Sequence, residues 1–311
     1  MAISSDVVSV SVPATSANLG SAFDAAGLAV DLRNEATFEL LPSTDVDITV
    51  HGQGASSLPK DRTNLVVSSF YRACDVFNVS PMGLRIEMTN RLPLSRGLGS
   101  SASAIVCGVA AAAAFGDYDL TQTDVRAAIF ELASEIEGHP DNAAPCIYGG
   151  LTFSWNRDGF HTVSYPVSNQ VTICLFIPDF ELSTDEARQA LPLSVPYSDA
   201  VFNLNRSALL PHALASGQQD ELFDATDDLL HQQYRGALMP ESFELVKSLR
   251  AQGFPAFISG AGPSVAVLSA DLDSPETIQF LKQTAAGSAS ADHWSFLQAQ
   301  IDTQGVVAHA A

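Results

Sequence analysis

The sequence predicts an α+β protein built from two packed domains. The chain has 311 residues, which is more than one hydrophobic core usually organises. Segments with strand periodicity alternate with segments of helical spacing, and after the glycines at 149–150 the pattern is that of a split βαβ sandwich. We place the boundary near Tyr165, which gives domains of residues 1–165 and 166–311 with a ligand-binding cleft between them.

The first half of the chain mixes strands and helices. β-Branched residues alternate over residues 7–12, so we expect a strand over residues 3–18 that ends in a turn at residues 18–20. Further strands are expected over residues 36–41, 46–50 and 84–89. Helical spacing predicts helices over residues 65–77, 101–115 and 123–137.

The second half follows the paired glycines. Strands are expected over residues 151–155, 161–165, 171–177, 256–259 and 264–268. Helices are expected over residues 184–191, 198–216 and 241–252. A glycine loop separates the last two strands.

Basic residues are scarce in this chain. The formal net charge is −20, from 35 acidic residues and only 15 Lys and Arg. This balance argues against a nucleic-acid partner, because nucleic-acid binding needs a broad basic surface. An anionic ligand must therefore be bound by a few local arginines and by backbone N–H groups.

The four cysteines lie in apolar surroundings without paired spacing, so we expect buried thiols rather than disulfides or a zinc site; they are Cys74, Cys107, Cys146 and Cys174. Trp155 is expected in the core as well. The longest apolar run, residues 104–115, is too short to span a bilayer. We therefore expect a cytoplasmic protein without a membrane partner.

A loop rich in glycine and serine precedes the predicted helix at 101–115 and predicts a site for nucleotide phosphates. Gly97 and Gly99 let the backbone approach phosphate oxygens, and the free N–H groups of a helix start favour an anion. The whole loop is assigned to the nucleotide: Pro93, Leu94, Ser95, Arg96, Gly97, Leu98, Gly99, Ser100, Ser101, Ala102 and Ser103. Two alternatives are a dinucleotide fingerprint, which these glycines also match, and a loop without function. The intervening residues 90–96 disfavour the fingerprint, because its first glycine directly follows a strand.

Two further loops contain clusters of small polar residues. One is Pro13-Ala-Thr-Ser-Ala-Asn-Leu-Gly-Ser-Ala-Phe-Asp24, and the other is Ser259-Gly-Ala-Gly-Pro-Ser264. Either alone fits an ordinary β-turn. With the phosphate loop between them, their order, spacing and content resemble those of the GHMP kinase superfamily over residues 7–268.

This resemblance implies a fold and cofactors. The fold is an α+β two-domain GHMP kinase fold, with an N-terminal domain like ribosomal protein S5, a ferredoxin-like C-terminal domain (split βαβ) and the active site in the cleft. The cofactors are ATP and Mg2+. Relatives are often dimers, so a homodimer is also an expectation.

Four segments resemble the homoserine kinase family within this superfamily. They are Pro13-Ala-Thr-Ser-Ala-Asn18, Glu137-Gly-His-Pro-Asp-Asn142, Ser183-Thr-Asp-Glu-Ala-Arg188 and His231-Gln-Gln-Tyr-Arg235. The resemblance implies phosphorylation of L-homoserine to O-phospho-L-homoserine in threonine biosynthesis. It assigns the amino-acid pocket to Asn18, Asp24, His139, Asp141, Arg188, Arg235 and Gly260.

The chemistry of these residues suits a zwitterion. Arg188 and Arg235 offer forked donors to a carboxylate, while Asp24 and Asp141 offer oxygens to an ammonium group. The alternatives are a kinase for another hydroxy amino acid or a mevalonate-like acid, and a non-catalytic protein that binds these ligands. An acid without an amino group would not need the aspartates.

The resemblance also implies a metal site and a catalytic set. Mg2+ is expected on Ser101 and an acidic residue, for which Glu137 is favoured over Glu131 and Glu135. The catalytic residues expected are Asn142, Asp141 and His139. Asn142 occupies the place of a base aspartate in mevalonate-type relatives, so we interpret it as an orienting residue, with His139 as an alternative general base.

Overall fold

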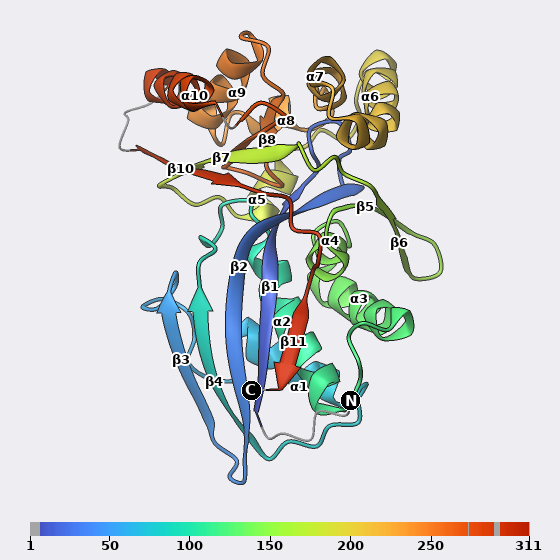
Figure 1. Cartoon of the computed structure of the whole chain (residues 1–311), viewed down its shortest axis with the longest axis vertical. Helices are drawn as coiled ribbons and strands as arrows, with labels where there is room; N and C mark the ends of the chain where they lie inside the picture. The colour runs from blue at the N-terminus through green and yellow to red at the C-terminus, as the bar shows by residue number, and fades with distance from the viewer. Residues whose placement is uncertain (1–6, 273, 289–292, 311) are drawn as a thin grey trace.

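In the computed structural model, which describes residues 7–272, 274–288 and 293–310, the chain forms two β-sheets, each with helices on it. Figure 1 shows a large sheet in the lower half and a small sheet in the upper half of the molecule. Strand β1 (Val7–Ala17) spans most of the lower half and delivers its C-terminal end to the junction between the two sheets. Residues 3–6 of the strand predicted here lie outside the described residues.

The large sheet has seven strands. Its main path runs β11 (Val307–Ala310), β1, β2 (Ala26–Leu41), β4 (Gly83–Asn90) and β3 (Val46–Gly52), while β5 (Leu151–Asn156) pairs with β2 and β6 (Phe160–Tyr165) pairs with β5. Helices α1 (Leu65–Cys74), α2 (Ser100–Phe115), α3 (Thr123–Glu137) and α4 (Ala143–Tyr148) pack around one core with its strands. Helix α2 is almost entirely buried because its residues are small and apolar.

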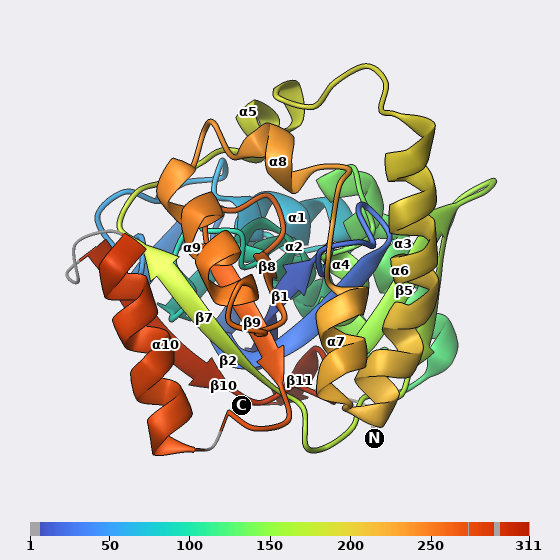
Figure 2. The ribbon, with the colours of Figure 1, turned by 90° about the horizontal axis from the view of Figure 1, so that it is seen from above.

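The small sheet has four antiparallel strands in the order β10 (Trp294–Ala299), β7 (Thr172–Pro178), β9 (Val265–Ser269) and β8 (Ala256–Ile258). Numbered along the chain, this is the order 4-1-3-2 of a split βαβ unit. The helices of this half, which Figure 2 shows around the sheet, are α5 (Thr184–Gln189), α6 (Tyr197–Ser216), α7 (Gln219–Ala225), α8 (Gln232–Arg235), α9 (Pro240–Arg250) and α10 (Pro275–Ser288). The predicted α+β class and split βαβ unit are confirmed.

The sequence missed several elements. The short helices α4, α7 and α8 escaped notice because they have too few residues for a 3.6-residue period to emerge. Strand β2 begins at Ala26 rather than at residue 36, because Asp31, Arg33 and Asn34 obscure its alternation. Strand β11 returns to the large sheet and pairs with β1, while β6 ends at Tyr165 and β7 begins the small sheet at Thr172. The division near Tyr165 stays a proposal.

The predicted core is largely confirmed. All four cysteines are free and buried. Trp155 was wrongly expected in the core: its side chain is 48% exposed and stacks on His161, with ring centroids 5.4 Å apart. Strand β6 forms the sheet edge there, and the last two residues of β5, Trp155 and Asn156, are exposed.

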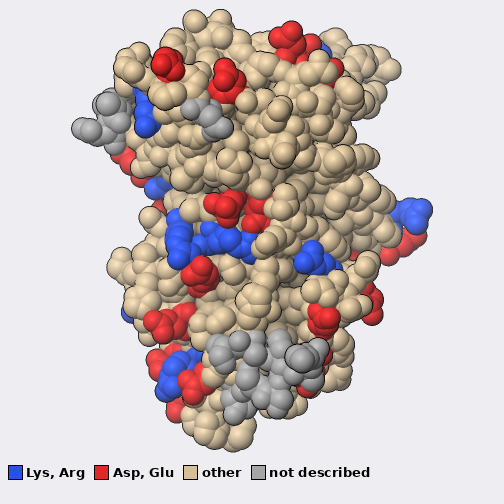
Figure 3. Space-filling model, in the orientation of Figure 1, with Lys and Arg blue, Asp and Glu red and all other residues tan. Residues whose placement is uncertain are grey.

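The surface has charges of both signs. On the face in Figure 3, Lys and Arg side chains lie beside Asp and Glu side chains rather than forming a broad basic surface. Ion pairs between exposed side chains include Arg85–Glu39 and Arg91–Glu35. Within the described ranges, none of the helices combines the length and apolar character needed to cross a membrane.

Candidate active site

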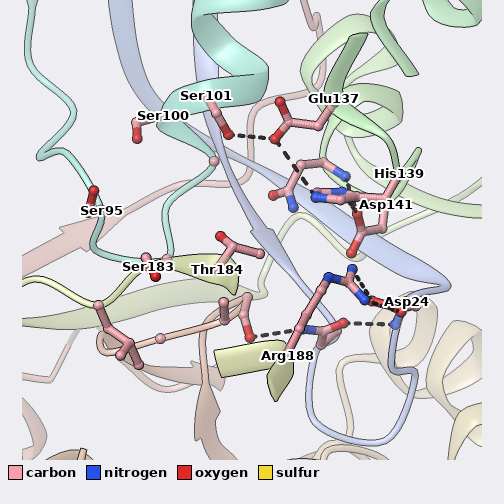
Figure 4. Close-up of a pocket in the computed structure, with 18 of the residues that line it drawn as sticks. Asp24, Ser95, Ser100, Ser101, Glu137, His139, Asp141, Ser183, Thr184 and Arg188 are labelled. Carbon is pink, nitrogen blue, oxygen red and sulfur yellow. Dashed lines mark hydrogen bonds and ion pairs between the residues drawn. The ribbon is translucent and has the colours of Figure 1, made fainter. Parts of the chain in front are cut away.

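A cavity of about 220 Å3 lies at the junction of the two sheets (Figure 4). Its walls come from the β1–β2 turn, the phosphate loop, the segment between α3 and α4, helices α5 and α8, and the β8–β9 turn. The lining residues are Asn18, Asp24, Ser95, Gly97, Gly99, Ser100, Ser101, Glu137, His139, Asp141, Asn142, Leu182, Ser183, Thr184, Arg188, Arg235, Gly260, Ala261 and Gly262. The three loops singled out in the sequence therefore meet at one cavity.

The phosphate loop depends on its two glycines. Gly97 and Gly99 have φ values of 72° and 65°, a region that other residues rarely adopt. A Cβ on Gly97 would lie 2.2 Å from the carbonyl oxygen of Ser259, and one on Gly99 would lie 1.9 Å from Oγ1 of Thr15. The close approach of all three loops thus requires glycine, and it leaves the N-terminal end of α2 facing the cavity.

Arg96 lies in the loop but does not face the cavity. Its guanidinium donates to the carbonyl oxygens of Leu94, Pro178 and Asp179 at 2.8–3.0 Å and pairs with Glu181. Arg96 therefore fastens the loop to the end of β7. Its predicted contact with ATP remains untested.

A second cavity of about 230 Å3 adjoins the phosphate loop and has a mainly apolar wall. It lies between β2, β4, α1 and α2, and shares Ser95, Ser100 and Ser101 with the first cavity. The hydroxyl of Ser103 lines it and has no hydrogen-bond partner among the described residues. An apolar slot beside an anion-binding helix start suits a nucleoside followed by its phosphates.

Glu137 and Ser101 are in direct contact. The Ser101 hydroxyl donates to Oε1 of Glu137 at 2.5 Å, and only 8% of the Glu137 side chain is exposed. Burial raises the pKa of Glu137, although the bond from Ser101 and the charge of His139 act against this. The two competing acids point elsewhere: Glu131 accepts from the backbone N–H of Phe160, and Glu135 pairs with Arg72 at the surface.

His139, Asp141 and Asn142 form one network. Nδ1 of His139 lies 2.7 Å from Oδ1 of Asp141, which also accepts from the backbone N–H of Asn142. The Thr15 hydroxyl donates to Oδ1 of Asn142 at 2.7 Å. Asn142 lines the cavity, and an amide whose oxygen is already bonded can offer N–H donors but cannot take a proton, which suits an orienting residue and not a base.

The pKa of His139 is raised. Burial lowers it, but the hydrogen bond and charge of Asp141, together with the charge of Glu137, outweigh burial. A raised pKa keeps His139 protonated over more of the pH range, which weakens the alternative that it acts as a general base.

This raised pKa predicts a pH-dependent stability. The His139 interaction should be fully present below the ordinary histidine pKa of about 6.5 and lost as pH rises through the higher folded-state pKa. We expect His139→Gln to lower the Tm most below about pH 6.5 and progressively less above it. Thermal unfolding across this range checks the sign; a Tm difference that grows with pH would contradict it.

Asp24 in the β1–β2 turn forms an ion pair with Arg188 of α5. Both terminal nitrogens of Arg188 donate to the carboxylate of Asp24 at 2.9 Å, as Figure 4 shows. Asn18 holds this turn by accepting from the backbone N–H of Asp24 and donating to the carbonyl oxygen of Gly260, both at 2.8 Å. Asp24 and Arg188 thus present one charge of each sign at the cavity wall.

Arg235 differs from Arg188 in having no carboxylate in ion-pair contact within the described part of the chain. Its side chain is 1% exposed and donates to the carbonyl oxygens of Ala187 and Gly260 at 3.1 and 3.4 Å. Burial lowers its pKa to about 10, so it remains a cation at neutral pH. A buried cation at a cavity wall, with no described carboxylate in ion-pair contact, is suited to an anionic ligand.

Comparisons with known proteins agree with this geometry. Residues 64–150 match the GHMP kinases N terminal domain and residues 210–280 match the GHMP kinases C terminal family. The homoserine kinase of Streptomyces coelicolor is 42% identical over 299 residues, which are 96% of this chain and 93% of the relative. The chain belongs to the homoserine kinase family.

Other members of the homoserine kinase family give the same result. The homoserine kinase of Clavibacter michiganensis is 41% identical over 301 residues, which are 96% of this chain and 92% of the relative. The crystal structure of homoserine kinase from Cytophaga hutchinsonii superposes with a TM-score of 0.84 and 28% identity, with 98% of both chains covered. A mevalonate kinase structure at 13% identity and a TM-score of 0.64 shares the fold.

Some cavity residues of this homoserine kinase family member were missed in the sequence. Ser183 and Thr184 begin α5 and line the cavity, and Ser183 forms a capping box with Glu186. The Ser-x-x-Glu spacing marks such a helix start and could have drawn attention to these hydroxyls. The apolar residues of the second cavity outside the phosphate loop, such as Ala36, Val66 and Met88, carry no comparable signal, because they look like ordinary core positions.

Proposed function

We propose that this protein transfers the γ-phosphate of ATP to the side-chain hydroxyl of L-homoserine. The observation that carries the proposal is the pairing of Asp24 with Arg188 at the same cavity as the buried guanidinium of Arg235, which has no carboxylate in ion-pair contact among the described residues. A small ligand with one carboxylate and one ammonium group complements all three side chains. Family membership supports the same substrate.

The two cavities fit the nucleotide. The apolar cavity suits the nucleoside, and the phosphates then extend to the N-terminal end of α2. Ser103 lines that cavity, and its hydroxyl has no hydrogen-bond partner among the described residues, which supports a polar ligand there. The absence of lysine from the loop makes backbone N–H groups the main phosphate donors.

Ser101 and Glu137 fit Mg2+. A hydroxyl and a buried carboxylate in contact are hard oxygen ligands, and Mg2+ commonly takes one or two such ligands plus substrate phosphates. The described residues contain no cluster of three or more metal-binding His, Cys, Asp or Glu side chains, so phosphates would supply the remaining ligands. When bound, the ion would neutralise charge on the phosphates.

The acceptor hydroxyl is aligned rather than strongly activated. Asp141 is 3% exposed and keeps Oδ2 free of the contacts that its Oδ1 makes to His139 and Asn142. We assign Oδ2 to the homoserine hydroxyl and the Asn142 amide to an oxygen of the transferred group. A loose phosphoryl-transfer transition state needs little nucleophile activation, so alignment and charge neutralisation account for the catalysis.

A panel of acceptors tests this function. Homoserine should give the highest kcat/KM among homoserine, threonine, serine and mevalonate in an ATP-turnover assay. Mevalonate lacks the ammonium group, which would leave Asp24 without its ligand partner. Equal or better turnover of mevalonate would overturn the amino-acid assignment, and no turnover with nucleotide binding retained would favour a non-catalytic protein.

We also propose a cytoplasmic location and a homodimer. The four free, buried thiols suit a reducing compartment. The edge strand β6 carries no charged residue and exposes Val163 and Tyr165, which supports self-association. Light scattering measures the oligomeric state.

A further inference from the structure

We infer that His231 is a positioning residue that holds Arg235 in the substrate cavity. The inference rests on the proposed function, because it concerns how the carboxylate of the amino acid is bound. His231 lies outside the set of residues that line the cavity. Its influence on the substrate therefore passes through Arg235.

His231 is fully buried and is in contact with several groups around it. Its side chain has no exposed surface, and its ring stacks on Phe23 with centroids 5.0 Å apart. The carboxylate of Asp228 accepts from the backbone N–H groups of His231 and Gln232 at 3.1 and 2.8 Å. Helix α8, which carries Arg235, is thus fixed at the residue where it begins.

The two ring nitrogens of His231 have different partners, which fixes the tautomer. Nε2 lies 2.8 Å from the carbonyl oxygen of Gly20 and 3.6 Å from Oδ2 of Asp228, and both oxygens can only accept, so Nε2 carries the hydrogen. Nδ1 lies 3.3 Å from Nη1 of Arg235, which can only donate, so Nδ1 is an acceptor. The ring is therefore neutral, and burial lowers its pKa in agreement with this.

The neutral ring of His231 acts on Arg235 differently from a carboxylate. It orients Nη1 of Arg235 without neutralising the guanidinium, so the positive charge stays available to a ligand. The same ring donates to Gly20, which lies in the turn that carries Asn18 and Asp24. His231 thereby lies between the cation for the carboxylate and the turn for the ammonium group, and its bond to Arg235 is the one that acts on the substrate carboxylate.

Two substitutions of His231 test its hydrogen bonds to Gly20 and Arg235 separately. The Oδ1 atom of asparagine lies near the place of histidine Nδ1, and the Nε2 atom of glutamine lies near the place of histidine Nε2. His231→Asn therefore keeps an acceptor for Arg235, whereas His231→Gln keeps only the donor to Gly20. We expect H231Q to raise the homoserine KM about tenfold, equivalent to about 1.4 kcal/mol, and H231N to raise it less than about threefold. The KM for ATP should stay unchanged in both.

A double-mutant cycle excludes a general effect on folding. Once Arg235 is leucine, H231Q should cause no further loss of kcat/KM for homoserine, since residues that act through one contact are not additive. Tm values of both variants are measured alongside. Equal KM changes in H231N and H231Q, or losses that add to those of R235L, would overturn the inference. If the wild-type protein turns over no homoserine, the proposed function fails and this inference falls with it; if it does, only the inference is at stake.

Discussion

Replacing Arg235 with leucine should raise the KM for homoserine by about thirtyfold to several thousandfold while leaving ATP binding nearly intact. The estimate follows from the roughly 2–5 kcal/mol that truncating a buried, hydrogen-bonded partner of a charge pair costs, at about 1.4 kcal/mol per decade. Leucine fills part of the space but offers no donor to a carboxylate. The homoserine KM, the ATP KM and a nucleotide Kd measured on one variant distinguish a substrate-binding role from a phosphate-binding one.

Arg250 provides a matched control for Arg235. It too is largely buried, at 13% exposure, and donates to the carbonyl oxygens of Phe223 and Ala256, but it lines neither cavity. Arg250→Leu should lower the Tm and leave the homoserine KM unchanged. Loss of ATP affinity in Arg235→Leu with an unchanged homoserine KM would refute the carboxylate assignment.

The amino-acid composition of the loops predicted the site because the geometry of these loops allows few residue types at some positions. Gly97 must be glycine, since a side chain there would collide with the backbone of the β8–β9 turn. Such positions are visible in a sequence as glycine–serine clusters. Their approach in space was not visible, because it depends on the backbone bonds from Thr15 to Leu98 and from Ser264 to Arg96, which join segments far apart in the chain.

Side-chain direction was harder to predict than loop position. Arg96 lies in the phosphate loop, yet the carbonyl oxygens at the end of β7 bind its guanidinium. Arg188 and Asp24 were assigned to opposite ends of the substrate, and in the structure they bind each other. Sequence patterns identify charged residues that lie near a ligand. Which group each charged side chain binds depends on tertiary contacts, which the sequence pattern does not show.

The short elements were missed for a related reason. Helix α8 has only four residues, so no periodicity could reveal it, although it carries Arg235. Its start is fixed by Asp228, whose carboxylate accepts from the backbone N–H groups of residues 230–232. The helix therefore depends on a capping contact and on burial rather than on helix propensity.

Glu137→Gln should raise the Mg2+ concentration needed for half-maximal activity by at least about 10- to 100-fold. Mutation of a residue that only hydrogen-bonds to a metal ligand already lowers metal affinity by about this factor. At limiting Mg2+, kcat should fall by roughly 10²–10³, the cost of losing one charge-stabilising group in a transition state. Glutamine can still accept from Ser101 but lacks the charge that binds a divalent ion. Mg2+ titrations of ATP turnover measure both effects.

The same substitution should not destabilise the ligand-free protein. Burial raises the pKa of Glu137 above its ordinary value of 4.5, so the native state holds this proton more tightly than the unfolded chain. The contribution of Glu137 to the free energy of unfolding therefore falls as the pH rises from the pKa of the unfolded chain through the raised pKa of the native state. Glutamine stays neutral, so the variant does not lose this stability. At neutral pH, without nucleotide or Mg2+, the variant should melt at the wild-type Tm or above it.

Glu135→Gln is the matched control, because Glu135 lies on the same helix but pairs with Arg72 at the surface. It should change neither the Mg2+ requirement nor the Tm by much, since exposed ion pairs contribute about 0–1 kcal/mol. A shifted Mg2+ requirement in Glu135→Gln, with Glu137→Gln like the wild type, would move the metal site away from Ser101. For Glu137→Gln we expect two results together: excess Mg2+ restores the reduced activity, and the Tm is not lowered. Only a metal ligand whose burial costs stability until the ion binds gives both results.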